Sequence, residues 1–69
     1  MLPNCRVVCL GDFESGGLQF ARDQLVDINV KWILGGMISC VLPNGEEVDL
    51  RDERLSDPQV RIVADLSGE

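Results

Sequence analysis

The chain contains no histidine and no tyrosine, and its aromatic residues are limited to Phe13, Phe20 and Trp32. The commonest general base and a common phenolic acid are therefore missing, and a Cys–His nucleophile cannot form within this chain. Paired carboxylates such as Glu46 and Glu47 lie in a stretch expected to be extended, where adjacent side chains point to opposite faces. These absences predict that the protein is not an enzyme and has no small-molecule substrate.

Long hydrophobic runs are missing as well. No segment approaches the roughly 20 apolar residues that cross a bilayer, and the chain has no signal-peptide core. The three cysteines, Cys5, Cys9 and Cys40, are an odd number, which favours reduced thiols over a disulfide framework. We therefore expect a cytoplasmic protein that does not contact membranes.

The sequence also lacks motifs for metals and cofactors. Three cysteines without a histidine fall one ligand short of a zinc site, and their spacing is not that of a zinc knuckle. The glycine-rich segment 11–17 lacks the Lys-Ser/Thr ending of a phosphate-binding loop and the spacing of a dinucleotide turn. Its acids, Asp12 and Glu14, would repel phosphate. The sequence thus predicts no metal and no cofactor.

Basic residues are few: six Lys and Arg face twelve Asp and Glu, giving a net charge of −6. This balance opposes direct binding to nucleic acid or anionic membranes. Most acids follow residue 45, notably Glu46, Glu47, Asp49, Asp52, Glu53 and Asp57. The bland interpretation is a solvated edge strand and loop. The functional interpretations are that the patch attracts a basic partner, or that it imitates the phosphates of a nucleic acid and occupies the site that binds them.

At 69 residues the chain forms at most one small domain, 1–69, with a marginal core. A β-branched and apolar run predicts a first strand over residues 5–10, and the glycine-rich segment 11–17 is expected to be a loop. The apolar residues Leu18, Ala21, Leu25 and Val26 are spaced as on one side of a helix, which predicts a short helix over 18–26. The competing interpretation of 18–26 is a strand.

Turn signals at Gly35-Gly36 and Pro43-Asn44-Gly45 divide residues 28–50 into three antiparallel strands. Residues 59–66 favour a last strand, since Val60, Ile62 and Val63 are β-branched, although a helix beginning near Pro58 is the alternative. The order β-α-β-β-β-β predicts an α+β protein. We expect a small mostly antiparallel sheet or partly closed barrel with one short helix.

The turns fix the expected register of this sheet. A two-residue loop at Gly35-Gly36 pairs Leu34 with Met37, Ile33 with Ile38, Trp32 with Ser39, Lys31 with Cys40 and Val30 with Val41. A three-residue loop at 43–45 pairs Leu42 with Glu46, Cys40 with Val48 and Ile38 with Leu50. One face then carries Val30, Trp32, Leu34, Met37, Ser39, Val41, Glu47 and Asp49.

A large aromatic residue surrounded by aliphatic side chains and bordered by charge is typical of a binding anchor. The alternative is that helix 18–26 packs on Trp32 and buries it. We predict a small acidic protein that binds a protein or a second copy of itself, as an inhibitor, an adaptor or an assembly factor. The predicted contact residues are Val30, Trp32, Leu34, Met37, Val41, Glu47, Asp49, Asp52 and Glu53.

Overall fold

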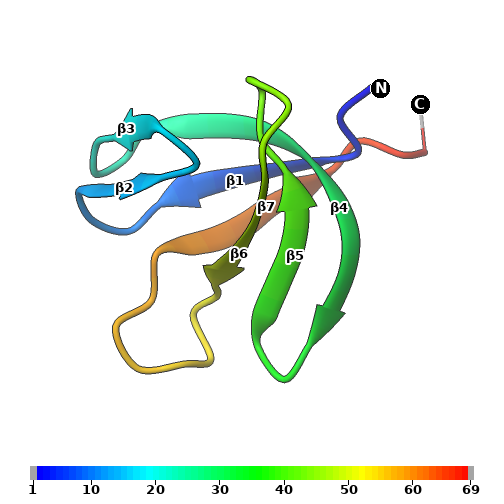
Figure 1. Ribbon diagram of the computed structural model, residues 1–69. Coiled ribbons are helices and arrows are strands. Elements are labelled where there is room, and N and C mark those ends of the chain that lie inside the picture. Colours follow the sequence, from blue (N-terminus) through cyan, green and yellow to red (C-terminus); the bar gives the residue numbers. More distant parts are fainter. Residues whose placement is uncertain (1, 69) are drawn as a thin grey trace.

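The computed structural model describes residues 2–68, which form seven strands (Figure 1). In chain order these are β1 (Cys5–Cys9), β2 (Phe13–Ser15), β3 (Leu18–Phe20), β4 (Leu25–Leu34), β5 (Met37–Val41), β6 (Glu47–Arg51) and β7 (Val60–Asp65). Five of them form an antiparallel sheet in the order β6-β5-β4-β1-β7, and β2 pairs with β3 in a separate hairpin. Residues 2–68 contain no helix, so the expected α+β class is wrong and the fold is all-β.

The expected helix over residues 18–26 is replaced by β3, a turn and the start of β4. Gly16 and Gly17 both have positive φ angles, 58° and 83°, which suit the turn of a tight hairpin between β2 and β3. Phe20, which lay off the helical stripe, is the side chain that enters the core, whereas Leu25 is exposed. The hairpin also stacks Phe13 on Phe20, with ring centroids 5.0 Å apart. Tertiary packing of Phe20 therefore overrides the local helical spacing.

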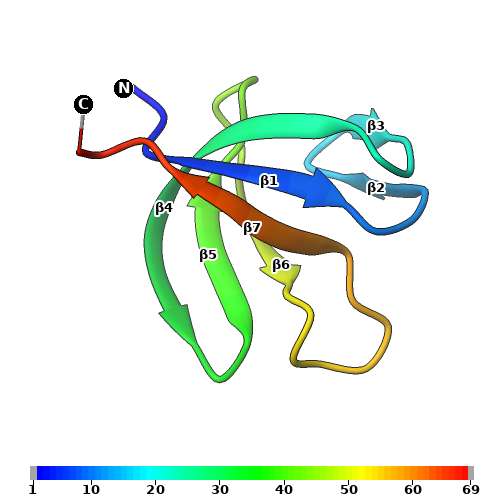
Figure 2. The same ribbon diagram turned by 180° about the vertical axis from the view of Figure 1, so that it is seen from behind.

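The sheet curls because β4 is shared by two partners. The first part of β4 pairs with β1, up to Ile28 opposite Cys5, and the second part pairs with β5. Figures 1 and 2 show the long β4 bending between these two partners. Gln59, just before β7, brings the two edge strands together at one end: its N–H donates to Arg51 O (2.9 Å), and its side-chain Oε1 accepts from Arg51 N (3.0 Å). The result is a partly closed barrel.

The β2–β3 hairpin packs against the loop between β5 and β6. Asn44 Nδ2 donates to Gly16 O at 2.9 Å. A Cβ at Gly16 would lie 2.7 Å from Leu42 Cδ1, so the approach of the two turns requires glycine there.

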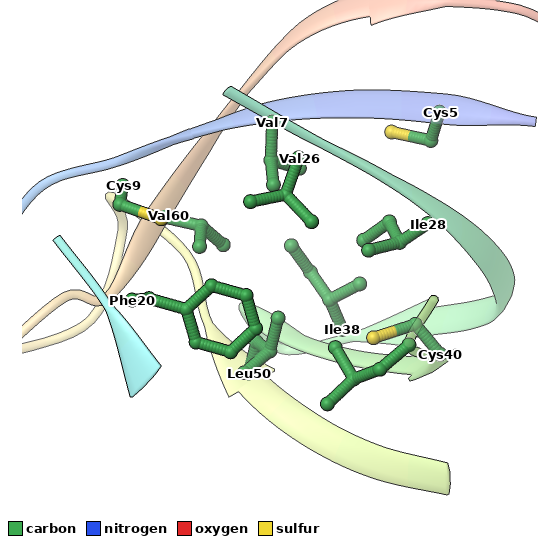
Figure 3. Packing of buried hydrophobic residues seen from close by; sticks show 11 residues of the cluster. Cys5, Val7, Cys9, Phe20, Val26, Ile28, Ile38, Cys40, Leu50 and Val60 are labelled. Carbon is green, nitrogen blue, oxygen red and sulfur yellow. The ribbon is translucent and has the colours of Figure 1, made fainter. Parts of the chain in front are cut away.

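The core lies inside the curl and draws on strands from both sheets (Figure 3). Cys5, Val7 and Cys9 of β1 are buried together because alternate residues of a strand face the same side, and all three cysteines of the chain are free thiols. Fully burying a Val or Ile side chain contributes roughly 1.5–3 kcal/mol to folding, so this core supplies most of the stability of the chain. Its members are Cys5, Val7, Cys9, Phe20, Val26, Ile28, Ile38, Cys40, Leu42, Leu50 and Val60.

The observed register matches the prediction near both turns and departs from it in the middle of β4. Leu34 pairs with Met37, Ile33 with Ile38 and Trp32 with Ser39; across the next turn, Cys40 pairs with Val48 and Ile38 with Leu50. The register then shifts between Val30 and Trp32, so that Val30 pairs with Cys40 and Asn29 with Val41. This β-bulge at Lys31 sends Val30 to the core side and keeps the ammonium group in water, where its charge stays solvated.

Candidate functional site

The convex side of the sheet formed by β4, β5 and β6 carries three rows of side chains, which we call the outer face. The register places Trp32, Ser39 and Asp49 in one row across the three strands. The row nearer the hairpin turn contains Leu34, Met37 and Arg51, and the row on the other side contains Asn29, Val41 and Glu47. Each row is set by strand pairing, so the turns that fix the register also position these side chains.

The apolar part of the outer face is exposed to solvent. Trp32 is 60% exposed and Leu34 is 76% exposed, while Met37 and Val41 are half-buried. No residue from 32 to 45 carries a charge, although the whole chain has 18 charged residues. Because Trp32 is this exposed, the alternative in which a helix over residues 18–26 packs on it and buries it is wrong. Large exposed aromatic and aliphatic side chains that lie together are typical of an interaction surface.

Charged groups on the outer face are only partly paired. Lys31, brought to this side by the β-bulge, contacts Glu47, with Nζ 2.6 Å from Oε1. Arg51 donates through Nε to Ser56 O at 2.8 Å. In residues 2–68 no cation lies within ion-pair distance of Asp49, which is exposed beside Ser39. Asp49 therefore presents an uncompensated carboxylate two strands from Trp32.

Asp52 and Glu53 belong to the turn after β6 rather than to the outer face. Asp52 is 6% exposed; its N–H donates to Gly36 O (2.8 Å), and its carboxylate accepts from Arg54 Nη2 (2.7 Å) and Arg54 N (2.9 Å). The Arg54 side chain lowers the pKa of Asp52 by hydrogen bonding to its carboxylate. Asp52 thus holds the turn against the β4–β5 hairpin, and Glu53 beside it is exposed.

Six of the nine predicted contact residues lie together on the outer face: Trp32, Leu34, Met37, Val41, Glu47 and Asp49. Val30 does not, because it packs against the core on the opposite side of the sheet. Asp52 is engaged in the turn, and Glu53 lies next to it. The structure therefore assembles the predicted apolar and acidic strand residues on one surface and separates the loop acids from them.

A groove of about 890 Å³ lies on another part of the surface, between β3, the first part of β4 and the end of β5. Its charged residues are Arg6 and Asp27, which pair with each other at 2.7 Å. This pairing lowers the pKa of Asp27 and raises the pKa of Arg6. The groove thus has no unpaired charge among its lining residues to orient a small ligand. It adjoins the outer face at Val41 and Asn29.

Two features of the site were not predicted from the sequence. Ile33 is 40% exposed although its partner Ile38 is fully buried, because β4 extends beyond the part of the sheet that the core fills. Lys31 reaches the outer face through a β-bulge, and a bulge has no clear signal in a single sequence. The charge-free segment 32–45 was the available hint that this hairpin presents an apolar surface.

Residues 2–68 contain no group of three or more Cys, Asp or Glu side chains arranged to hold a metal ion. No helix long and apolar enough to span a membrane occurs in the same part of the chain. No protein-family model, no curated protein and no solved structure matches this sequence or fold.

Proposed function

We propose that this chain is a small acidic interaction protein without enzymatic activity, acting as an inhibitor, an adaptor or an assembly factor by binding protein through the outer face. The observation that carries the proposal is that Trp32 and Leu34 are exposed next to each other, with the uncompensated carboxylate of Asp49 two strands away on the same face. Tryptophan is enriched among the few residues that supply most of the energy of an interface. An acidic border favours partners with basic groups around an apolar centre.

We further propose that the protein acts in the cytoplasm without a cofactor. Three free and buried cysteines suit a reducing compartment, where no disulfide is needed to hold a small fold together. Burial raises the pKa of each thiol, so these cysteines are poor nucleophiles and poor metal ligands at neutral pH.

Mimicry of nucleic acid receives less support from the arrangement of the acids. Of the six carboxylates in segment 46–57, Glu47 is paired with Lys31 and Asp52 with Arg54. An array that imitates phosphates needs its charges free and regularly exposed, whereas binding centred on Trp32 does not.

Affinity capture with matched variants tests the proposal. The full chain, Trp32→Ala and Leu25→Ala are immobilised separately, since Leu25 is equally exposed but lies seven residues from Trp32 along β4. We expect the wild type and Leu25→Ala to retain the same proteins at high salt, and Trp32→Ala to lose them. For a purified partner, the dissociation constant should rise about 30-fold or more with Trp32→Ala.

Two results would count against this function. Retention of the same proteins by all three forms would mean that Trp32 is not an anchor. Capture that disappears at high salt in every form would instead favour a purely electrostatic partner of the acidic segment, as nucleic-acid mimicry requires.

A further inference from the structure

The edge of β4 that faces away from β5 is paired over only part of its length. Asn4 N donates to Ile28 O at 3.0 Å, and the Asn4 side-chain amide then bonds both Val30 O (3.0 Å) and Val30 N (2.7 Å). The side chain of Asn4 thus replaces a peptide group and ends the pairing with the first strand. From Lys31 to Leu34 no strand of residues 2–68 lies on this side of β4. Both ribbon views show this part of β4 at the outer boundary of the molecule (Figures 1 and 2).

Backbone alternation identifies which groups this open edge presents. The two-residue turn at Gly35 and Gly36, with φ of 59° and 88°, makes Leu34 and Met37 the hydrogen-bonded pair that closes the hairpin. The next pair, Ile33 and Ile38, is then the non-hydrogen-bonded kind, in which each residue directs its N–H and C=O away from its partner. Ile33 therefore points one donor and one acceptor toward the open edge.

The side chains around Ile33 suit antiparallel pairing with an identical strand. If Ile33 lies opposite Ile33 of a second copy, Trp32 of each copy lies opposite Leu34 of the other. Trp32 and Leu34 share the outer face, and Ile33 lies on the inner one, so both sides of the new pairing are apolar. These three residues are also among the large hydrophobic side chains most exposed in the chain, at 60%, 76% and 40%.

Charge on β6 and an irregular register on β7 make the two end strands of the sheet less suited to pairing with a second copy than the open edge of β4. The exposed edge strand β6 carries Glu47 and Asp49, so pairing it with its own copy would bring like charges together. β7 carries a register shift opposite Arg6 and Val7, which disrupts regular pairing. By contrast, the nearest charge on β4 is Lys31, which is already held by Glu47 of the same chain.

We propose that the open edge of β4 pairs antiparallel with the same edge of a second copy about Ile33, giving a two-fold dimer. The inference rests on the proposed function and deepens it by naming a second copy as the partner of the open edge that borders Trp32 and Leu34. The two outer faces then join in one surface across β6-β5-β4 of each copy, with the two Trp32–Leu34 pairs at its centre. Glu47 and Asp49 lie toward both rims, where they remain available to another partner.

Sedimentation of the full chain over a micromolar to millimolar concentration series tests the dimer. We expect a mass that rises to twice 7.6 kDa and a tighter dimer at high salt, since salt screens the repulsion between two chains of charge −6. A wild type that remains monomeric throughout, or a dimer that salt weakens, would overturn the proposal. The proposed function would be unaffected by that result, because it is decided by the loss of capture with Trp32→Ala.

Ile33→Pro with Ile33→Ala as its control separates edge pairing from other contacts. Proline removes the outward N–H together with the isoleucine side chain and fits an edge position, so the fold should persist in circular dichroism while dimerisation weakens at least about tenfold. Ile33→Ala keeps the N–H and should weaken the dimer less. Equal dimerisation of Ile33→Pro and the wild type would place the interface elsewhere.

If Ile33→Pro fails to fold, amide hydrogen exchange of the unmodified chain tests whether the edge of β4 pairs in the dimer. The Ile33 amide should become protected as the concentration rises, while the Trp32 amide, which points toward β5, should exchange equally slowly at every concentration. If the mass doubles but the exchange rate of the Ile33 amide does not change with concentration, pairing through this edge is excluded.

Discussion

Ile38 is the residue on which the inner face of the sheet depends most. It is fully buried, and it lies opposite Ile33 on one side and Leu50 on the other. Its place is fixed by the turn at Gly35-Gly36, because a slip of one residue would bring Ser39 or Met37 to the core.

Ile38→Asp should leave the chain unfolded at neutral pH, because it puts an unpaired charge among apolar side chains. Leu34→Asp is the control, since Leu34 lies on the same hairpin but is exposed. Circular dichroism with urea titration distinguishes the two variants. A folded Ile38→Asp protein would contradict the register described above.

Cys40 is buried in the core, and burial raises its pKa to about 11, with the nearby charges of Asp49 and Cys5 adding to the effect. The folded chain therefore holds the thiol proton more tightly than the unfolded chain, whose thiol has a pKa near 9.0. The resulting stability is fully present below pH 9 and is lost as the pH rises toward 11.

Urea midpoints measured from pH 8 to pH 11 should therefore fall, and the fall should be shallower in Cys40→Ala, which cannot ionise at this position. Cys5 and Cys9 have raised pKa values as well, so a residual slope should remain in that variant. Identical slopes in the two proteins would show that ionisation of Cys40 is not coupled to folding.

Among the elements, the β4–β5 hairpin contributes most to the candidate site. Its two turn glycines both have positive φ, but their surroundings differ. A Cβ on Gly35 would meet nothing within 4 Å, whereas a Cβ on Gly36 would lie 2.7 Å from Leu55 Cγ. Gly36 is thus needed for the packing of the turn 52–55 as well as for its backbone angle.

Gly36→Ala should destabilise the fold by about 2–4 kcal/mol, combining backbone strain with overpacking against Leu55. Gly35→Ala has the strain alone and should cost about 1–2 kcal/mol. Gly35→Asn should be nearly neutral, since Asn followed by Gly is favoured in such turns. Urea denaturation of the three variants gives the comparison; equal losses for Gly35→Ala and Gly36→Ala would mean that Leu55 moves aside.

The sequence predicted those elements that are bounded by turn signals. The prediction was wrong where packing between distant segments determines the local structure. The strands over 5–10, 28–34 and 59–66 and the two turn registers follow from glycines, Asn44 and alternating apolar residues. Residues 18–26 were predicted helical because their apolar spacing fits a helix, but Phe20 gains burial only when the hairpin turns it inward. Local periodicity contains no information about that contact.

At the scale of the whole molecule, the structure is a small curled sheet with a filled inside and a partly apolar outside. The turn chemistry was sufficient to predict that Trp32, Leu34, Met37, Val41, Glu47 and Asp49 share a face. The turn chemistry did not predict that Val30 faces the core. That orientation depends on the bulge at Lys31, which reflects the cost of burying an ammonium group. The open edge of β4 was also beyond prediction, since it depends on where Asn4 ends the pairing with β1.

The acidic charge of the chain acts at this same scale. With a net charge of −6, separate molecules repel one another over distances set by the ionic strength, and the charge-free segment 32–45 is where that repulsion is locally weakest. In the proposed dimer the acids would lie on the periphery of the assembly, where they would remain solvated and available to a basic partner.

Acrylamide quenching of Trp32, the only tryptophan in the chain, measured across a concentration series, tests whether the outer face is exposed in the monomer and borders a second copy in the dimer. We expect solvent-exposed, readily quenched emission at low concentration and a partial blue shift with reduced quenching as the molecules associate, because Leu34 of the second copy then lies beside Trp32. Protected emission at the lowest concentration would contradict this expectation, because the chain itself would then cover the outer face. Emission and quenching that do not change while the mass doubles would exclude a pairing that places Leu34 of the second copy beside Trp32.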